Sequence, residues 1–427
     1  MSRLARAKRL LERGIVAATT VMALAACSAH SVARLPSPPT FAASNIPAIG
    51  SWTGNAAGTA DDLISNSRSG SLIVPPGSAG RELWTETDAR NDLLKHLAAR
   101  PLAVRNSLHD SAGDTMDTAK IIQASPGNYL AVYATGNVIK LATSTDLVNW
   151  LYVTDVDPSA TQPYIAQGPN GSYIVADEKY DTNGVTSGSS HLYFIHYAKL
   201  SALLAGRSDW IASPPSNPSL GGDRFYSLCN EGTPDFHGIR PVGQRGYVVV
   251  NFGFHYNSHC GAPGPDREGY GTFQVTSLAS STGRATANWS ASRDTARDDA
   301  VADIGFTGSR GGRDDVSWHK WRFSIQEAQC GSQITAACTA GNAAHAFTRW
   351  RYVLYDYSNQ RAYPVAVPAS VETVNGATAW CHGNPKMAAL NNPDGRPVLV
   401  VTGFIFGPPG GCVPSGTIAG EFVYVVP

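Results

Sequence analysis

The chain has 427 residues, and its 33 Lys and Arg residues balance its 33 Asp and Glu residues, so the formal net charge is zero. Nucleic-acid binders generally need a basic face for phosphate, and this balance argues against such a partner. Only 15% of residues are charged, while 42 Gly, 27 Pro and 9% aromatic residues favour many short strands over long helices. A hydrophobic share of 43% excludes disorder throughout the chain.

The first 27 residues have the layout of an export signal. A basic head, which ends at Arg13, precedes the uncharged and mostly apolar stretch 14–26. This stretch is shorter than the roughly 20 residues that span a bilayer, so we predict a secretory signal over residues 1–27. Leu24-Ala25-Ala26-Cys27 resembles a bacterial lipobox, and an ordinary cleavage site with a chance Cys is the alternative. We expect an exported protein anchored through lipidated Cys27 to a bacterial membrane, at the cell surface or periplasmic face.

Six cysteines follow Cys27, and an even number in an exported chain predicts disulfide bonds. Proximity in the sequence favours three local pairs, which are Cys229–Cys260, Cys330–Cys338 and Cys381–Cys412. The cysteines lack the two-residue spacing of a zinc site, and the chain has no His-Glu-x-x-His motif. We therefore predict no catalytic metal.

A change of composition separates a linker from the main domain. Residues 28–80 are rich in Ser, Ala, Pro and Gly, which predicts a flexible linker, and residues 81–427 form the predicted domain. Residues 86–104 are the best helix candidate in it. Thr85 can cap this helix, and three leucines, at 93, 94 and 97, form one apolar stripe.

From residue 118 onward, turns alternate with runs of β-branched and aromatic residues, which is typical of strands. A turn, an inner strand and a following hairpin recur five times. The predicted inner strands begin at Tyr129, Tyr173, Tyr247, Trp321 and Pro397. This recurrence predicts an all-β, five-bladed β-propeller with an N-terminal tether and a short helix; an array of β-sandwiches is the alternative. Uneven intervals, from 44 residues (Tyr129 to Tyr173) to 74 residues (Tyr173 to Tyr247), predict long loops on one face.

Three short motifs carry a family resemblance. Asp117 opens a segment that closes with Ser-x-Asp-Leu-x-x-Trp at residues 144–150. It resembles the first blade of the five-bladed propeller glycoside hydrolases of the family 43 and family 62 clan, as a distant relative. Residues 230–236, Asn-Glu-Gly-Thr-Pro-Asp-Phe, resemble the Glu-containing turn before that clan's third blade. Residues 381–385 precede the last blade, where related propellers place a His near the axis, sometimes beside calcium. The resemblance implies a glycosidase that requires no cofactor and has room for a structural Ca²⁺.

Hydrolysis of a glycosidic bond needs two carboxyl groups on either side of it. Residues at the starts of inner strands meet around one axis, so we predict Asp117 as the base and Glu231 as the acid. An inverting enzyme would hold them about 6.5–9.5 Å apart, and burial would raise the pKa of Glu231 as an acid requires. Asp114 and Asp110 are the alternative bases, and Asp235 is the alternative acid.

The clan's third carboxylate, which orients the acid, is expected near the start of blade two. This chain has Gln162-Pro163-Tyr164 there, with no acid. Either another carboxylate substitutes, or the activity has been lost. The substitutes considered are Asp157, Asp177, Glu178 and the pair Asp314-Asp315.

Four side chains near blade starts or loops are predicted to bind substrate: His382, Trp318, His255 and Tyr256. Aromatic rings stack on sugar faces, although most aromatic residues pack in cores. Residues 308–313 are read as a flexible basic loop, which lacks the Lys-Ser/Thr ending of a phosphate-binding loop.

These observations predict an exported, lipid-anchored and monomeric glycoside hydrolase. It would cleave arabinose- or galactose-type bonds of a polysaccharide by inversion. One alternative is a non-catalytic surface propeller that binds glycan or protein. A second is a structural envelope protein whose loops mediate assembly.

Overall fold

The structure is a computed structural model. It describes residues 84–180, 190–214, 232–243, 246–257, 264–278, 283–331, 350–368, 373–374, 377–378, 382–405 and 420–427. The chain divides into two units, Met1–Ala57 and Gly58–Pro427, and every described residue belongs to the second. The predicted signal, the whole predicted linker, Glu231 and five of the six later cysteines lie outside the described residues. Cys330 is described, and it is disulfide-bonded.

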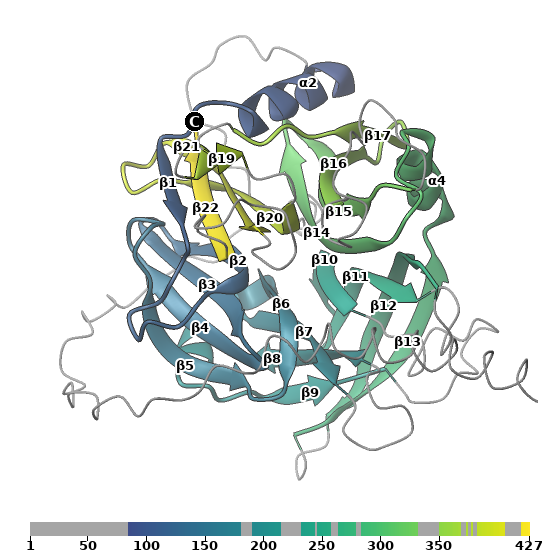
Figure 1. Ribbon diagram of the computed structural model, residues 1–427. Helices are drawn as coiled ribbons and strands as arrows, with labels where there is room; N and C mark the ends of the chain where they lie inside the picture. Colours follow the sequence, from purple (N-terminus) through teal and green to yellow (C-terminus); the bar gives the residue numbers. More distant parts are fainter. Residues whose placement is uncertain are drawn as a thin grey trace, which may run out of the picture. The chain divides into compact units, whose positions relative to one another are not determined.

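Five four-stranded antiparallel sheets make up the fold, each with its strands in chain order except the last (Figure 1). Blade one has β2 (Asp117–Ser125), β3 (Asn128–Thr135), β4 (Val138–Ser144) and β5 (Leu151–Asp157). Blade two has β6 (Ala160–Gln167), β7 (Tyr173–Tyr180), β8 (Ser190–Tyr197) and β9 (Trp210–Ala212). Blade three has β10 (Gly232–Pro241), β11 (Val248–Asn257), β12 (Asp266–Leu278) and β13 (Ala285–Arg293). Blade four has β14 (Arg310–Trp318), β15 (Trp321–Gln329), β16 (Trp350–Asp356) and β17 (Arg361–Pro364).

Blade five combines strands from the two ends of the described chain. β20 (His382–Asn391), β21 (Pro397–Ile405) and β22 (Gly420–Val426) pair in sequence, and β1 (Ala103–Asn106) adds the fourth, outer strand against β22. This pairing closes the ring of blades, because residues from before blade one complete the last sheet. A separate two-stranded sheet contains β18 (Thr373–Val374) and β19 (Ala377–Thr378). The predicted five-bladed propeller is confirmed.

The first strand of each blade lies at the centre. β2, β6, β10, β14 and β20 each contact the next one around a closed ring, and Figure 1 shows them around the middle of the sheets. The prediction that Tyr129, Tyr173, Tyr247, Trp321 and Pro397 begin the inner strands is therefore wrong. Those residues lie within one residue of the starts of the second strands. Second strands are dense in β-branched and aromatic residues because both of their faces are buried, whereas the inner strands carry more polar residues, Gly and Pro.

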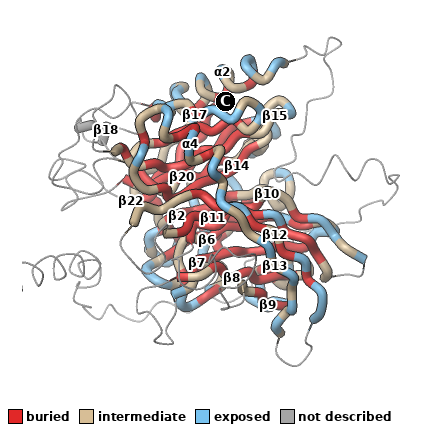
Figure 2. The backbone as a smooth tube through the Cα atoms, turned by 90° about the vertical axis from the view of Figure 1, so that its right-hand side faces the viewer, coloured by how far each residue is buried: buried red, intermediate tan, exposed pale blue. Residues whose placement is uncertain are grey.

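Apolar clusters hold most neighbouring blades together. One cluster joins blades one and two, another joins two and three, and others join four with five and five with one. Figure 2 shows the buried residues running along the strands of the sheets. In the described part of the chain, no apolar cluster joins blade three to blade four. That interface is polar.

Helices are few among the described residues. They are α2 (Glu86–Leu97), α3 (Leu200–Leu204), α4 (Thr295–Asp303) and the 3-10 turn Pro169–Gly171. Thr85 caps α2 in a capping box with Asp88, and Leu93 and Leu97 are buried against blades four and five. The helix ends at Leu97 rather than at the predicted residue 104, where β1 takes over. No helix in the described ranges is both long enough and apolar enough to cross a membrane.

Candidate functional site

The five inner strands begin at one end of the ring, called here the strand-start end. Each inner strand carries a bulge within its first few residues. Four of these bulges contain a non-glycine residue at positive φ, namely Thr118, Gln162, Thr233 and Asn384, and blade four has Gly311-Gly312 at the same point. Bulges re-aim side chains and are common beside functional sites. A repeated bulge therefore sets which side chains the inner strands present at the strand-start end.

Buried glutamates from other strands hold these bulges. Both carboxylate oxygens of Glu421 in β22 accept backbone N–H bonds of 3.0 Å, from Thr118 and Ala119. Glu327 in β15 accepts from Gly312 at 2.9 Å and from Asn384 at 2.7 Å, and so ties blade four to blade five. Burial raises the pKa of Glu327 to about 7 and raises that of Glu421 well above its usual value.

The same kind of contact ties blade two to blade three. Glu178 in β7 accepts a hydrogen bond from the backbone N–H of Thr233 at 3.3 Å, and burial raises the pKa of Glu178 to about 7. Thr233 also donates through its hydroxyl to the carbonyl of Gly311 at 3.3 Å. These contacts connect the first residues of neighbouring inner strands. All five inner strands therefore begin at the same end of the ring.

Charged side chains fill the centre just below the bulges. Lys120 of blade one and Tyr164 of blade two both donate hydrogen bonds to the carboxylate of Asp314 in blade four. The backbone N–H of Met387 in blade five donates to the same carboxylate at 2.8 Å. Lys386 donates to the carbonyl of Arg313 at 2.9 Å. Asp314, one of the predicted substitutes for the blade-two acid, is thus hydrogen-bonded to Tyr164 of blade two and forms an ion pair with Lys120.

Asp117 begins β2 at the strand-start end and is partly buried. Burial raises the pKa of Asp117 to about 6, against a smaller lowering by the charge of His109. Burial raises the pKa of Glu421, and the negative charge of Asp117 raises it further. A partly buried carboxyl with a raised pKa at the strand-start end suits proton transfer.

Other predicted site residues lie at the same end. His255 pairs with Gly232 across β11 and β10 and lies 2.6 Å from the Thr233 hydroxyl. Burial lowers the pKa of His255 to about 3 and that of His382, at the start of β20, to about 4. Both imidazoles are therefore neutral at neutral pH. Tyr256 is buried in the core between blades two and three, so its ring is not available to stack on a sugar.

Two predicted alternatives to the catalytic pair have structural partners. Asp114 forms an ion pair with Lys140 of β4 at 2.6 Å, away from the inner strands. Asp235 is fully buried in β10. Burial favours a higher pKa for Asp235, but the charges of His237 and Arg313 outweigh it and hold the pKa below its usual value. A buried carboxylate held in its charged form does not suit the role of general acid.

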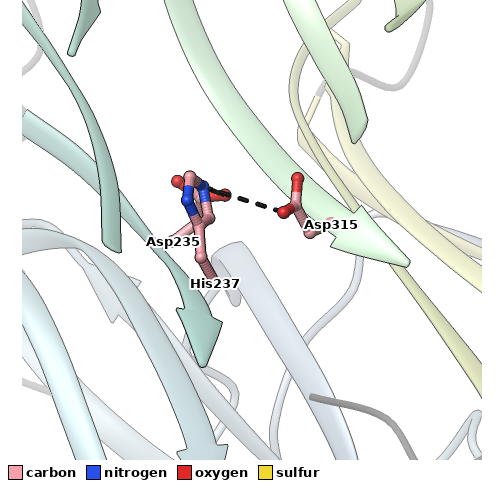
Figure 3. A group of neighbouring side chains, drawn as sticks. All are labelled: Asp235, His237 and Asp315. Atoms are coloured by element: carbon pink, nitrogen blue, oxygen red, sulfur yellow. Dashed lines mark ion pairs between the residues drawn. The ribbon is translucent and has the colours of Figure 1, made fainter. Parts of the chain in front are cut away.

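The polar interface between blades three and four is built around Asp235. His237 Nε2 lies 3.2 Å from Asp235 and 3.7 Å from Asp315 of β14, and Figure 3 shows the three side chains facing one another across the two strands. Their ligand atoms lie within 4.8 Å of one another, close enough to share a metal ion. Residues 308–313 were predicted to be a flexible basic loop, but Arg310 and Arg313 are buried in β14, so that prediction is wrong.

The charges around this cluster weigh against a cation. Four carboxylates (Asp235, Glu268, Asp294 and Asp315) pair with three guanidiniums (Arg297, Arg313 and Arg322). A cation in this cluster would be repelled by those guanidiniums, and each pair of like unit charges costs about 4 kcal/mol at 4 Å with an effective dielectric constant of about 20. The guanidiniums therefore already supply the positive charge that a metal would offer these carboxylates.

Trp318 lies at the opposite end of the ring. It closes β14, and its indole N–H donates to Asp92 of α2 at 2.8 Å. An inner strand of nine residues rises by roughly 25–30 Å, so Trp318 and Asp117 do not share a site. Helix α2 covers this strand-finish end beside blade four (Figure 1).

Sequence reasoning missed Lys120, Tyr164, Lys386, His237 and Glu421. A signal for three of the five bulges was present: Pro163, Pro234 and Pro385 occupy the same bulge position. The residue after each proline is Tyr164, Asp235 or Lys386, and these face the central network. Asp266, which begins β12, was also missed. Burial raises its pKa to about 6, and its charge helps to raise the pKa of Glu178.

Comparisons with known proteins give structural likenesses. No family model and no curated protein matches the chain. An endo-arabinase from Bacteroides thetaiotaomicron is similar at 8% identity and a TM-score of 0.42, covering 76% of this chain and 98% of that one. A GH43 endo-arabinanase from Bacillus licheniformis gives 12% identity and 0.39, covering 75% and 96%. A GH32 β-fructofuranosidase from Bombyx mori gives 11% and 0.38, covering 80% and 67%. An activity for this chain must therefore be argued from its own side chains.

Proposed function

We propose that this protein is a glycoside hydrolase whose active site lies at the strand-start end of the ring. One observation carries the proposal: Asp117, at the start of the first inner strand, is partly buried and has its pKa raised to about 6 by burial. Above that pH the ionised carboxylate can accept a proton from water. This is the role of the base in an inverting glycosidase.

The second carboxyl in this proposal is Glu231, the residue before Gly232 in the sequence. It lies outside the described residues, and its role as the acid is a proposal from the sequence. Asp266 is a described alternative, because it begins a strand of the same blade and has a raised pKa. A carboxyl with a raised pKa retains the proton that a leaving oxygen needs.

The test uses the full-length, detergent-solubilised protein with aryl arabinofuranosides, aryl galactofuranosides and arabinose- or galactose-containing polysaccharides. Asp117→Asn and Glu231→Gln should each abolish hydrolysis while leaving the thermal transition in place. Asp394→Asn, at an exposed turn, is the matched control. Full activity in Asp117→Asn would refute the assignment of Asp117 as the base. Loss of activity in Asp266→Asn, together with retained activity in Glu231→Gln, would assign the acid to Asp266. NMR of the first product would show inversion.

A non-catalytic propeller that binds glycan or protein is the second candidate. The filled centre favours it, since Lys120 and Tyr164 already engage Asp314, a predicted substitute for the third catalytic carboxylate. Binding of a polysaccharide in affinity electrophoresis, without release of reducing sugar from any substrate, would support this candidate over hydrolysis.

The cellular setting is part of the proposal. Export and lipidation at Cys27 rest on the lipobox-like residues 24–27, and an arabinose- or galactose-type polysaccharide rests on the resemblance of blade one. We also propose a monomer with three local disulfide bonds. Cys27→Ser should release the protein from membranes into the soluble fraction.

A further inference from the structure

A cavity of about 380 Å³ opens between blades three and four. Its lining residues are His237, Asp315, Val316, Ser317, Lys320, Trp321, Arg322 and Ser358. Residues 316–322 form the last part of β14, its hairpin and the start of β15, so the cavity lies toward the strand-finish end. It is separate from Asp117, and its volume falls in the range of small-molecule sites.

The cavity borders the interface between blades three and four, which is polar in the described part of the chain. Other neighbouring blades are joined by apolar clusters among the described residues, whereas blades three and four bury paired charges. Buried ion pairs are often no more stabilising than apolar residues of the same size. A charged interface beside an open cavity therefore indicates a binding role rather than a packing role.

Lys320 and Arg322 line this cavity together with Asp315, so their charges leave an excess of one positive charge. Asp315 is already engaged by Arg322, through Nε at 2.7 Å and through Nη2, and by Arg297 at 3.6 Å. No hydrogen bond among the described residues engages the remaining nitrogen, Nη1, of Arg322. Lys320 is exposed, and its ammonium lies 5.5 Å from the centre of the Trp321 ring. Arg322 and Lys320 both line the cavity, so both can donate hydrogen bonds to an anion bound there.

The hairpin that presents Lys320 has an unusual backbone. His319 and Lys320 form a two-residue turn between Trp318 and Trp321, with φ of 47° and 71°. Asn-Gly is the usual choice for such a turn, because positive φ strains other residues. Strain that persists at non-glycine positions is more frequent at ligand sites.

Helix α2 and the residue before its cap hold this turn. The His319 ring stacks on Trp84 with centroids 3.8 Å apart, and its Nε2 lies 3.1 Å from Asp92. Trp321 donates its indole N–H to the carbonyl of Trp84 at 3.1 Å. These contacts hold in place the turn that carries Lys320.

We propose that this cavity binds the carboxylate of an acidic sugar, a uronic-acid residue. The carboxylate pairs with Arg322 and Lys320, the hydroxyls of Ser317 and Ser358 meet sugar hydroxyls, and the Trp321 ring offers an apolar face. The site binds ligand without reacting with it. It does not depend on hydrolysis at the strand-start end, so either proposal can fail alone.

Isothermal titration of the full-length protein with galacturonate, galactose and acetate tests the site. Galacturonate should bind, galactose should bind at least about tenfold more weakly because it lacks the charge, and acetate should compete weakly because it lacks the ring. Lys320→Asn keeps a residue that tolerates positive φ and removes the charge, so it should weaken galacturonate binding about tenfold without loss of stability. Lys199→Asn, which removes an exposed charge on blade two, is the control.

Several results would overturn the site. Equal affinity for galacturonate and galactose, no galacturonate binding at millimolar concentration, or unchanged affinity in Lys320→Asn would each do so. If acetate binds as tightly as galacturonate, the site recognises carboxylates in general, and the proposal of an acidic-sugar site is refuted. A divalent metal that copurifies at one per chain and is lost in His237→Gln would show that a cation, not an anion, occupies this interface.

Discussion

Replacement of Glu421 by Gln tests how the structure positions Asp117. Each Glu421 oxygen accepts one backbone N–H bond of 3.0 Å, from Thr118 and from Ala119, directly after Asp117 in the chain. An amide has one acceptor oxygen, so its NH₂ group would face a backbone N–H. One bond is lost, and a buried donor is left without a partner. The expected cost is about 1–3 kcal/mol, or roughly 3 °C in Tm for a chain of this size.

Differential scanning calorimetry and activity on the best substrate measure the two consequences. Glu327→Gln is the matched control, because Glu327 holds two backbone N–H groups of blades four and five in the same way. Both variants should lose similar stability, but only Glu421→Gln should reduce kcat, since only it loosens the strand that carries Asp117. A Tm change below about 1 °C in Glu421→Gln, or equal kcat in both variants, would refute this reasoning.

Three further predictions concern the centre of the ring. Tyr164→Phe removes a hydrogen bond to the buried carboxylate of Asp314 and should cost about 1.5–3 kcal/mol in urea unfolding; a cost below 0.5 kcal/mol, as an order-of-magnitude threshold, would contradict the network. His382 has its folded pKa lowered by burial to about 4, so the unfolded state binds more protons between about pH 4 and 6.5, and stability rises with pH there. His382→Gln should flatten that slope, and an unchanged slope would exclude His382 as its source. Gly253→Ala would place a methyl group 2.2 Å from Asp235 and should lower Tm by several degrees, whereas a wild-type Tm would show that the cluster has room.

The second strands of the blades could be predicted well from the sequence. Segments such as residues 129–134 and 398–404 are rich in aliphatic and aromatic side chains and lie after turns, and burial on both faces needs such residues. The inner strands were not recognised, because β10 and β14 contain Gly, Pro and charged residues that are unfavourable in an isolated strand. Their polar groups are satisfied by partners in other blades, such as Glu178 for Thr233.

The sequence by itself determined the alternation of turns and strands, the helix cap at Thr85 and the choice of Asp117 as a candidate base. These features depend on residues that are neighbours in the sequence. Only the tertiary structure decided which charges meet. It placed Asp314 between Lys120 and Tyr164, and His237 between two aspartates. Those side chains come from different blades, and closure of the ring sets their distances. No local pattern encodes the partner of a buried charge, although that partner controls its pKa and its role.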